Sequence, residues 1–377
     1  MRRGEQRIDA PDVLILGPVP PPFGGVSVHL SRLVPLLESA GLKVAVLNHF
    51  SSADGPGVVG AMKKNPLNYY RFPKRFRSRI VHYHHARWAH LVATALGKRS
   101  NDGRYIVTLH AGQVGNGSPF TSKNALISRI TRWALSRFDT VIVVNPKIAS
   151  TVNRHLDKQR IEVLPAFVGA GNDEFDTYEP AIEAFLNTGR VLVVSAYAIQ
   201  FLDGNREVYG LDNAIEAFIE VGSERDDLRL AIFVARRPSR AKARRHLASL
   251  ERRLDAARLR QRALIVFDLP LRPALRQNAI YVRPTRADGD AVSVREAQAA
   301  GVPVIASNVV QRPSGVVLFQ TEDVAGFCDA LRTVLDNSAP RIKPPSRGNG
   351  GPAGNEFAEK LIQLYRRELA AHARAGD

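Results

Sequence analysis

Short apolar runs alternate with helical patterns along the first part of the chain. Residues 13–16, 44–47 and 140–145 are largely apolar runs of strand length, as expected for strands buried on both faces of a parallel sheet. Between the first two runs, residues recur at the spacing of one helix face: Val26, His29, Leu30, Leu33 and Leu37. This alternation predicts an α/β fold.

The same alternation restarts after a polar, acidic and glycine-containing stretch at residues 169–188. Further strands are predicted at residues 191–194, 230–234 and 264–267, with a helix at residues 211–221. Residues 341–354 are rich in Pro and Gly, and a last helix is predicted from Glu356 to about His372. The chain therefore divides into two α/β halves with a linker between them.

The stretch from residue 280 to residue 307 is predicted to form a strand, a loop, a helix and a second strand. Residues 280–282 are apolar, and Pro284 ends their strand because it cannot donate to a ladder. The helix begins near Ser293 and stops at Gly301, and residues 304–306 form the next strand. Such a loop lies at the C-terminal edge of a parallel sheet, where α/β proteins bind ligands.

Two acidic residues flank the start of this helix. Seven residues separate Asp288 in the loop from Glu296 in the first turn. In one interpretation, a single ligand lies across the helix N-terminus and touches both carboxylates. In the other, Ser293 and Glu296 form a capping box that serves the helix alone.

A glycine pair, Gly24-Gly25, precedes the first predicted helix. Glycines at a helix N-terminus let backbone N–H groups approach an anion closely, although a structural turn explains the pair equally well. The loop lacks the G-x-G-x-x-G fingerprint of dinucleotide sites. A nicotinamide or flavin cofactor is therefore disfavoured.

The charge balance is unusual for a chain of otherwise ordinary composition. The apolar share of 45% and the charged share of 24% are those of a globular protein, but the net charge is +17. An excess of this size indicates a polyanionic partner or surface. The single cysteine, Cys328, lies in an apolar pattern and is expected in the core. No apolar run is long enough for a spanning helix or a signal peptide, so a soluble or peripheral protein is expected.

The most basic interval extends from residue 62 to residue 80 and contains no acid. Its cations are Lys63, Lys64, Arg71, Lys74, Arg75, Arg77 and Arg79, with aromatic residues interleaved. Such a segment is typical of contact with an anionic membrane leaflet, where each cation contributes about 1 kcal/mol. The alternative is a solvated face with extended arginine stems.

Histidines cluster at residues 82–85, but alternate strand residues face opposite ways and no Cys or carboxylate group accompanies them, so metal binding is not expected. His110 differs because it closes an apolar strand, which places it at the C-terminal edge of a sheet. A strand-end histidine with a purely structural role is the alternative.

Two of these stretches resemble the retaining glycosyltransferases of family 4. The segment from Glu296 to Val304, EAQAAGVPV, is similar to the family's "EA-x-A-x-G-x-PV" motif, and Asp288 stands where the family has the first of its two Glu residues. The segment GGVSVHLSRLVPLLESAGLKV, from Gly24, resembles the opening of these enzymes. The resemblance covers nearly the whole chain and is strongest from residue 282 to residue 319.

The resemblance implies a GT-B fold, in which two Rossmann-like domains face each other across a cleft. The implied parts are an acceptor domain at residues 1–168, a linker at 169–188, a nucleotide-sugar-binding domain at 189–345, and a helix at 355–373 that packs back on the first domain. The implied activity is transfer of a hexose from a UDP- or GDP-linked sugar to a glycan or lipid-linked acceptor. The implied setting is polysaccharide or glycolipid assembly at the inner face of the cytoplasmic membrane.

The resemblance also assigns residues. Catalytic roles fall on His110, Asp288 and Glu296, and neither a cofactor nor a metal is expected. Asp288-Gly-Asp290 is similar to the D-x-D metal motif, but that motif belongs to a single-domain plan. The donor-binding set is Gly24, Gly25, Arg206, Gly289, Asp290, Ala291, Val292 and Ser293.

One departure from the family concerns the donor diphosphate. Many relatives hold it with an Arg and a Lys in "R-x-x-x-x-KG", whereas Tyr209 stands before Gly210 here. Arg206 is the nearest substitute, and Arg236-Arg237, after the strand that ends at Val234, are a second candidate. A charge-assisted hydrogen bond contributes about 1.5–3 kcal/mol, so an uncompensated loss weakens donor binding about tenfold or more.

Two other functions remain open. A phosphorylase or epimerase would use the same architecture. A catalytically impaired protein that binds polyanions would use the charge alone, without a recognisable nucleic-acid module and hence without specific nucleic-acid binding.

Overall fold

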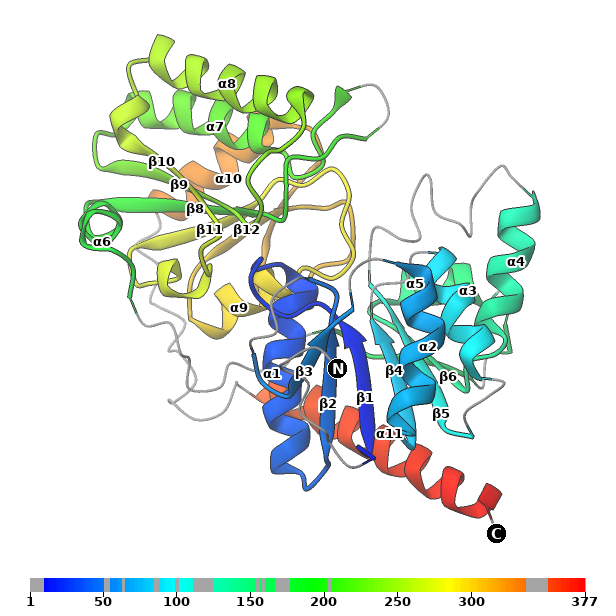
Figure 1. Cartoon of the computed structure of the whole chain (residues 1–377). Helices are drawn as coiled ribbons and strands as arrows, with labels where there is room; N and C mark the ends of the chain where they lie inside the picture. Colours follow the sequence, from blue (N-terminus) through cyan, green and yellow to red (C-terminus); the bar gives the residue numbers. More distant parts are fainter. Residues whose placement is uncertain are drawn as a thin grey trace. The chain divides into compact units, whose positions relative to one another are not determined.

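The computed structural model describes residues 10–50, 55–62, 65–84, 88–98, 102–110, 125–153, 156–157, 160–166, 177–202, 205–336 and 352–376. Two compact units make up the chain (Figure 1). The first comprises residues 1–20, 26–168 and 352–377, and the second comprises residues 21–25 and 169–351. Each unit is an α/β structure built on one parallel sheet, as the alternating pattern predicts.

The first unit contains a seven-stranded parallel sheet in the order β3-β2-β1-β4-β5-β6-β7. Its strands are β1 (Val13–Gly17), β2 (Val44–Asn48), β3 (Val58–Ala61), β4 (Ile80–His84), β5 (Arg104–Leu109), β6 (Thr140–Val143) and β7 (Ile161–Val163). Its helices are α1 (Gly25–Ser39), α2 (Pro66–Phe76), α3 (Trp88–Gly97), α4 (Ala125–Leu135), α5 (Pro146–Val152) and α11 (Pro352–Gly376). The order reverses between β1 and β4, so their C-terminal ends border a topological switch point.

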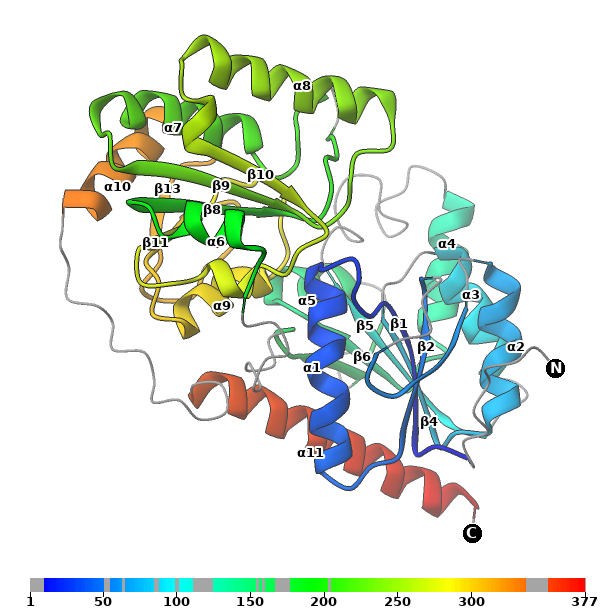
Figure 2. The same cartoon turned by 60° about the vertical axis from the view of Figure 1, so that its left-hand side comes forward.

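The C-terminal helix α11 is part of the first unit. Leu361, Leu364 and Tyr365 share one buried cluster with the apolar face of α1 and with residues of β1, β2 and β4. The Tyr365 hydroxyl lies 2.5 Å from His82 Nδ1, so the helix is also tied to the middle of the sheet by a hydrogen bond. Figure 2 shows α1 and α11 together over the same part of this unit.

The second unit contains a six-stranded parallel sheet in the order β10-β9-β8-β11-β12-β13. Its strands are β8 (Arg190–Ala196), β9 (Leu228–Val234), β10 (Ala263–Phe267), β11 (Ala279–Arg283), β12 (Val304–Ser307) and β13 (Val317–Phe319). Its α-helices are α6 (Pro180–Leu186), α7 (Leu211–Glu224), α8 (Ala241–Ala256), α9 (Val292–Ala299) and α10 (Val324–Asp336). Short 3₁₀ turns lie at Arg260–Arg262 and Arg272–Ala274.

Alternate residues of the central strands point to two separate cores. Leu192 and Val194 face the cluster covered by α7, α8 and α10, whereas Val191 and Val193 face the cluster that includes α6 and α9. Cys328 is buried in the first of these clusters, as expected. Helices on both faces explain why these strands read as continuous apolar runs.

One local feature differs from the sequence expectations, and one helix contains an internal proline. The stretch expected to be a linker, residues 169–188, contains α6. Helix α2 begins at Pro66, where Asn65 caps it by accepting the N–H of Leu67, and it contains Pro73 in its interior. Within the described ranges, none of the helices has the length and apolar character that a membrane crossing requires.

Candidate active site

The candidate site of the second unit lies at the C-terminal edge of its sheet, where strand order reverses between β8 and β11. β11 ends at Arg283, and the loop that follows leads into α9. Gly210 packs against this loop with a φ of +68°, and a Cβ there would lie 1.9 Å from the carbonyl oxygen of Pro284. Only glycine permits this close approach, which brings Tyr209 beside the end of β11.

A buried ion cluster occupies this edge. The carboxylate of Asp288 accepts hydrogen bonds from Arg283 at 3.1 and 3.2 Å and from Arg312 Nη1 at 2.9 Å. The exposed fractions of the three side chains are 8% for Asp288, 10% for Arg283 and 2% for Arg312. Burial alone would raise the pKa of Asp288, but the two guanidinium groups outweigh it and lower that pKa to about 2.

Tyr209, which stands where relatives carry a lysine, supports one of these arginines. The Arg283 guanidinium lies over the Tyr209 ring at 5.1 Å from its centroid, and its Nη1 donates to the Ser195 carbonyl at 2.9 Å. Burial raises the pKa of Tyr209 to about 12, so the phenol is neutral at pH 7. The position thus supplies an aromatic platform for a cation in place of a cation of its own.

The start of α9 is held by hydroxyl groups, and the capping-box interpretation of Ser293 and Glu296 is wrong. The N-cap residue is Ala291, which makes no side-chain cap hydrogen bond. Ser293 is already inside the helix, where its hydroxyl accepts a 2.6 Å hydrogen bond from Tyr281, and Tyr281 also shares one of 2.7 Å with Ser195. Glu296 lies one turn further on and is half-buried.

The remaining loop residues expected to bind the donor are partly engaged within the loop. The Gly289 N–H donates to Asp288 Oδ1 at 3.0 Å. Asp290 accepts from Arg295 Nε at 3.1 Å, and burial raises the pKa of Asp290 in spite of that arginine. Val292 is buried at the first position of α9. The N–H groups at the helix start are therefore what this loop presents to a ligand.

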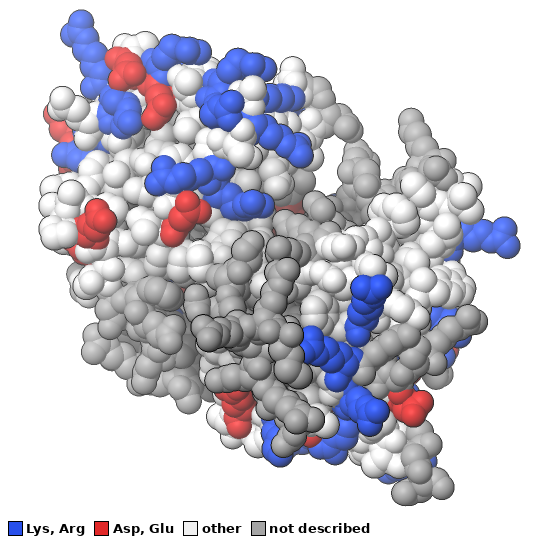
Figure 3. All heavy atoms as spheres, viewed as in Figure 1, with Lys and Arg blue, Asp and Glu red and all other residues white. Residues whose placement is uncertain are grey.

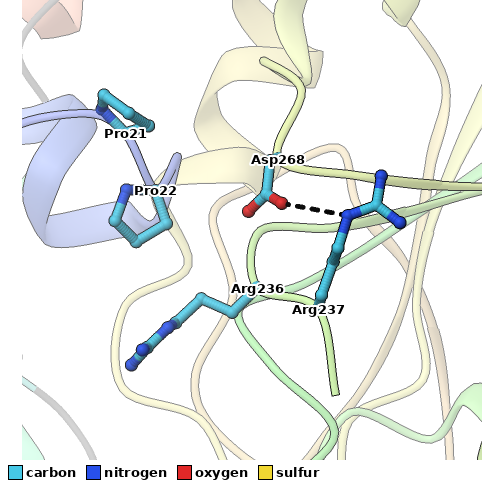
Figure 4. A pocket seen from close by; sticks show the side chains of 5 residues that line it. All are labelled: Pro21, Pro22, Arg236, Arg237 and Asp268. Carbon is cyan, nitrogen blue, oxygen red and sulfur yellow. Dashed lines mark ion pairs between the residues drawn. The ribbon is translucent and has the colours of Figure 1, made fainter. Parts of the chain in front are cut away.

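The other cations considered for the diphosphate have partners other than Asp288 in the second unit. Arg206 is 54% exposed and pairs with Glu322 at 3.1 Å, so it belongs to a different ion-pair network from Asp288. Arg237 pairs with Asp268 at 3.5 Å beside a hollow that Pro21, Pro22 and Arg236 also line (Figure 4). Gly24 belongs to the same loop as these prolines, and a Cβ there would lie 2.5 Å from the Tyr197 ring.

His110 lies in a group of buried histidines at the C-terminal edge of the first unit's sheet. It directly follows β5, and its Nε2 is 3.2 Å from Nδ1 of His84, the last residue of β4. The His29 ring lies 5.8 Å from that of His110. Burial lowers the pKa of His84 well below its usual value and that of His29 to about 4, so both are neutral at pH 7. Among the residues that the structure describes, no group of three His, Cys, Asp or Glu side chains is arranged to hold a metal.

The basic interval of the first unit is partly described. Arg71, Arg75 and Arg77 are exposed, whereas Arg79 forms an ion pair with Asp12. Tyr69, one of the interleaved aromatic residues, is fully buried beside Tyr83 and His90. Lys63, Lys64 and the side chain of Lys74 lie outside the described residues.

Sequence reasoning missed Arg283 and Arg312 as site residues. Arg283 ends an otherwise apolar strand and is 92% buried. A charged residue is rarely buried unless it has a partner, so a charge in such a strand indicates one. A charge at the end of a buried strand, one residue before a proline, was the available signal. Arg312 offered none, because it lies in a polar segment 24 residues from Asp288.

Comparison with known proteins gives two family matches. The model of Glycosyltransferase Family 4 matches residues 23–170, and that of Glycosyl transferases group 1 matches residues 199–337. The two matches fall on the first and second unit, respectively. No sequence match was found among the curated proteins searched.

Several solved structures share the fold over nearly the whole chain. Sucrose-phosphate synthase from Thermosynechococcus elongatus is 17% identical with a TM-score of 0.67, covering 97% of this chain and 100% of its own. Anabaena HepE in complex with UDP-glucose is 12% identical with a TM-score of 0.67, covering 96% and 99%. A trehalose 6-phosphate synthase from Burkholderia multivorans is 12% identical with a TM-score of 0.63, covering 98% and 99%. The predicted GT-B fold is confirmed.

Proposed function

The chain belongs to the family 4, group 1 glycosyltransferases, and from this membership we propose that it is a retaining, metal-independent hexosyltransferase that uses a nucleotide sugar. The donor is a UDP- or GDP-linked sugar, and a UDP-linked one is favoured because the similar Anabaena protein was solved with UDP and with UDP-glucose. The acceptor is a glycan or a lipid-linked sugar in cell-surface polysaccharide or glycolipid assembly.

The observation that carries this proposal is the start of α9 at the switch point of the second sheet. The Val292 and Ser293 N–H groups lie in the first turn, where no preceding carbonyl of the helix accepts them. They suit the negative charge that develops on a departing diphosphate. Glu296, one turn further on, accepts hydrogen bonds from the nucleotide ribose.

The reacting sugar is assigned to the histidine at the end of β5. His110 is only 7% exposed, and its hydrogen bond with His84 restricts the orientation of its ring. An imidazole in this place contacts the sugar hydroxyl groups as hydrogen-bond donor or acceptor. Gly25, the first residue of α1, has no side chain to keep the donor phosphates from the helix start, whereas the side-chain space of Gly24 is filled by the Tyr197 ring.

The acceptor proposal rests on the outer surface of α2, α3 and α4, which pack side by side (Figures 1 and 2). On α2, Leu67, Arg71 and Arg75 are all exposed at i, i+4, i+8 spacing. On α4, Leu126 is 64% and Trp133 is 37% exposed. An apolar and cationic surface of this kind suits an anionic leaflet, the setting of a lipid-linked acceptor.

The charge of this region strengthens the membrane proposal. Residues 55–138 contain 15 Lys and Arg and a single acid, Asp102. Of the interleaved aromatic residues, Tyr69 faces the core, so this surface relies on the exposed apolar residues in its place. Binding is peripheral and on the cytoplasmic side, where the nucleotide sugar is found.

Substitution of Glu296 tests the proposal directly. Glu296→Ala should abolish sugar transfer while leaving the far-UV circular dichroism spectrum and the melting temperature close to those of the wild type. A nucleotide-sugar screen by thermal shift, run on both proteins, identifies the donor. Turnover near the wild-type value in the Ala variant would contradict the assignment.

A second candidate, polyanion binding without catalysis, is favoured by the surface of α8. Figure 3 shows Lys and Arg side chains gathered over the part of the second unit that carries this helix. Its exposed cations are Lys242, Arg244, Arg245 and Arg252. Salt-dependent binding to duplex DNA near physiological ionic strength, together with no binding of any nucleotide sugar, would favour this function over transfer.

A further inference from the structure

The ion cluster around Asp288 contains more positive than negative charge. Two guanidinium groups, those of Arg283 and Arg312, share one carboxylate. All three side chains are at least nine-tenths buried, so water screens these charges weakly. The neighbouring pair of Asp290 and Arg295 is balanced within itself and does not remove the excess.

The hydrogen-bonding capacity of the two arginines is unequally used. Arg283 donates to Asp288 through Nε and Nη2 and to the Ser195 carbonyl through Nη1, and its face is covered by Tyr209. Arg312 donates to the Ser307 carbonyl through Nε and to Asp288 through Nη1. Its Nη2 is buried and, among the described residues, has no hydrogen-bond acceptor. A buried charged donor left in this state is costly, so a ligand acceptor is expected there.

We propose that Arg312 is the diphosphate-binding cation of this protein, and that Asp288 positions Arg312 and Arg283 without contacting the sugar itself. This rests on the proposed function, because the ligand is the diphosphate of the nucleotide sugar. It assigns the cationic role that Tyr209 leaves open to a residue on a different segment, between β12 and β13.

The chemistry of the ligand follows from the donors. A guanidinium group whose Nη1 and Nε are already fixed presents Nη2 in one direction, which suits a phosphoryl oxygen. Asp288 also ties Arg312 to the loop that leads into α9, where the open N–H groups supply further donors to the same anion. The Asp288 carboxylate already accepts hydrogen bonds from two arginines, so it has little remaining capacity to accept hydrogen bonds from sugar hydroxyl groups.

The test compares the binding of UDP, uridine and inorganic pyrophosphate by calorimetry in the wild type and in Arg312→Gln. Loss of one charge-assisted hydrogen bond should weaken UDP and pyrophosphate binding about ten- to hundredfold. Uridine binding should change less than twofold, because uridine carries no phosphate. Arg332→Gln is the matched control, since Arg332 on α10 is also held by carboxylates, those of Glu220 and Glu224 on α7 and of Asp329 on α10, away from the loop of Asp288.

Arg312→Lys covers the case in which the Gln variant does not fold. Lysine retains the charge, but its single ammonium group cannot replace three guanidinium nitrogens, so UDP binding should still fall at least several-fold. A folded Gln variant that binds UDP like the wild type would overturn the inference and leave the glycosyltransferase function standing. If the Gln variant is unfolded, equal UDP binding by wild type and Lys variant would overturn it.

The measurement of pyrophosphate binding distinguishes failure of the Arg312 assignment from failure of the proposed glycosyltransferase function. A wild-type protein that binds pyrophosphate through Arg312 but no nucleotide sugar would retain the anion site and contradict the proposed function. A wild-type protein that binds neither ligand would overturn both. Equal binding of UDP and uridine by the wild type would also overturn the inference, because the phosphates would then contribute nothing.

Discussion

Replacing Asp288 by Asn removes the one negative charge between two buried guanidinium groups. The side chain keeps its size, but Arg283 and Arg312 lose their shared counter-charge. Removing one partner from a buried ion pair costs about 3–5 kcal/mol, because the remaining charge stays out of water. We expect the free energy of unfolding of the second unit to fall by this amount at pH 7.

The pKa of Asp288 supplies an independent magnitude. Burial would raise this pKa, but the two arginines lower it from 3.8 to about 2. That difference corresponds to about 2.5 kcal/mol of stability. Because the folded state has the lower pKa, this stability is present above about pH 4 and is lost as the pH falls toward 2. The stability difference between wild type and Asn variant should therefore shrink by about 2.5 kcal/mol over that range.

The two tryptophans allow the units to be followed separately. Trp88 and Trp133 both belong to the first unit, so their fluorescence reports its unfolding, whereas far-UV circular dichroism follows both units. Urea titrations of the Asn variant should show an earlier transition by circular dichroism and a fluorescence transition close to that of the wild type.

Asp290→Asn is the matched control for this experiment. Asp290 lies two positions away on the same loop, but burial raises its pKa, so its ionised form is disfavoured in the folded state. Its replacement should cost less stability at pH 7, and the difference from wild type should have the opposite pH dependence. An Asp288→Asn protein as stable as the wild type at pH 7 would refute the buried cluster.

Three further predictions concern other parts of the chain. Burial raises the pKa of Glu207 to about 7, so the stability of the second unit should decline as the pH rises from about 4.5 through 7, and Glu207→Gln should remove that slope in urea titrations at several pH values. His110→Ala should lower turnover more than donor affinity, measured by rates beside calorimetry, and unchanged turnover would count against the sugar contact. Gln substitutions of three exposed arginines in and just after α2 should reduce sedimentation with anionic liposomes at low salt. Gln substitutions of three arginines that form ion pairs in the second unit serve as controls. Equal sedimentation of all variants would exclude the membrane surface. The substituted residues are Arg71 and Arg75 of α2 and its C-cap residue Arg77, and the controls are Arg225, Arg253 and Arg332.

Much of the fold was predictable because buried parallel strands and amphipathic helices have simple patterns. Residues 280–282 were expected as a strand and lie in β11, and the helix expected from Ser293 is α9, which begins one residue earlier. The helix expected at residues 211–221 is α7. Local periodicity sufficed in these cases, since each pattern reflects which residues of one segment are buried.

The direction in which a side chain points was less predictable. Aromatic residues among the cations of residues 62–80 suggested membrane contact, yet Tyr69 is in the core and Leu67 is exposed on the same helix. A helix places its residues on all sides, and only packing against α3 and the sheet determines which side becomes the interior.

The sequence by itself determined two α/β halves, the helix that carries Glu296 and the position of Asp288 in the loop before it. The tertiary structure decided what Asp288 does. Its partners, Arg283 and Arg312, precede it by 5 residues and follow it by 24, and they meet because β11 and β12 are adjacent strands whose C-terminal ends share one edge. Ion pairs depend on distance in space and on exclusion of water, and neither quantity is encoded in the spacing of charged residues along the chain.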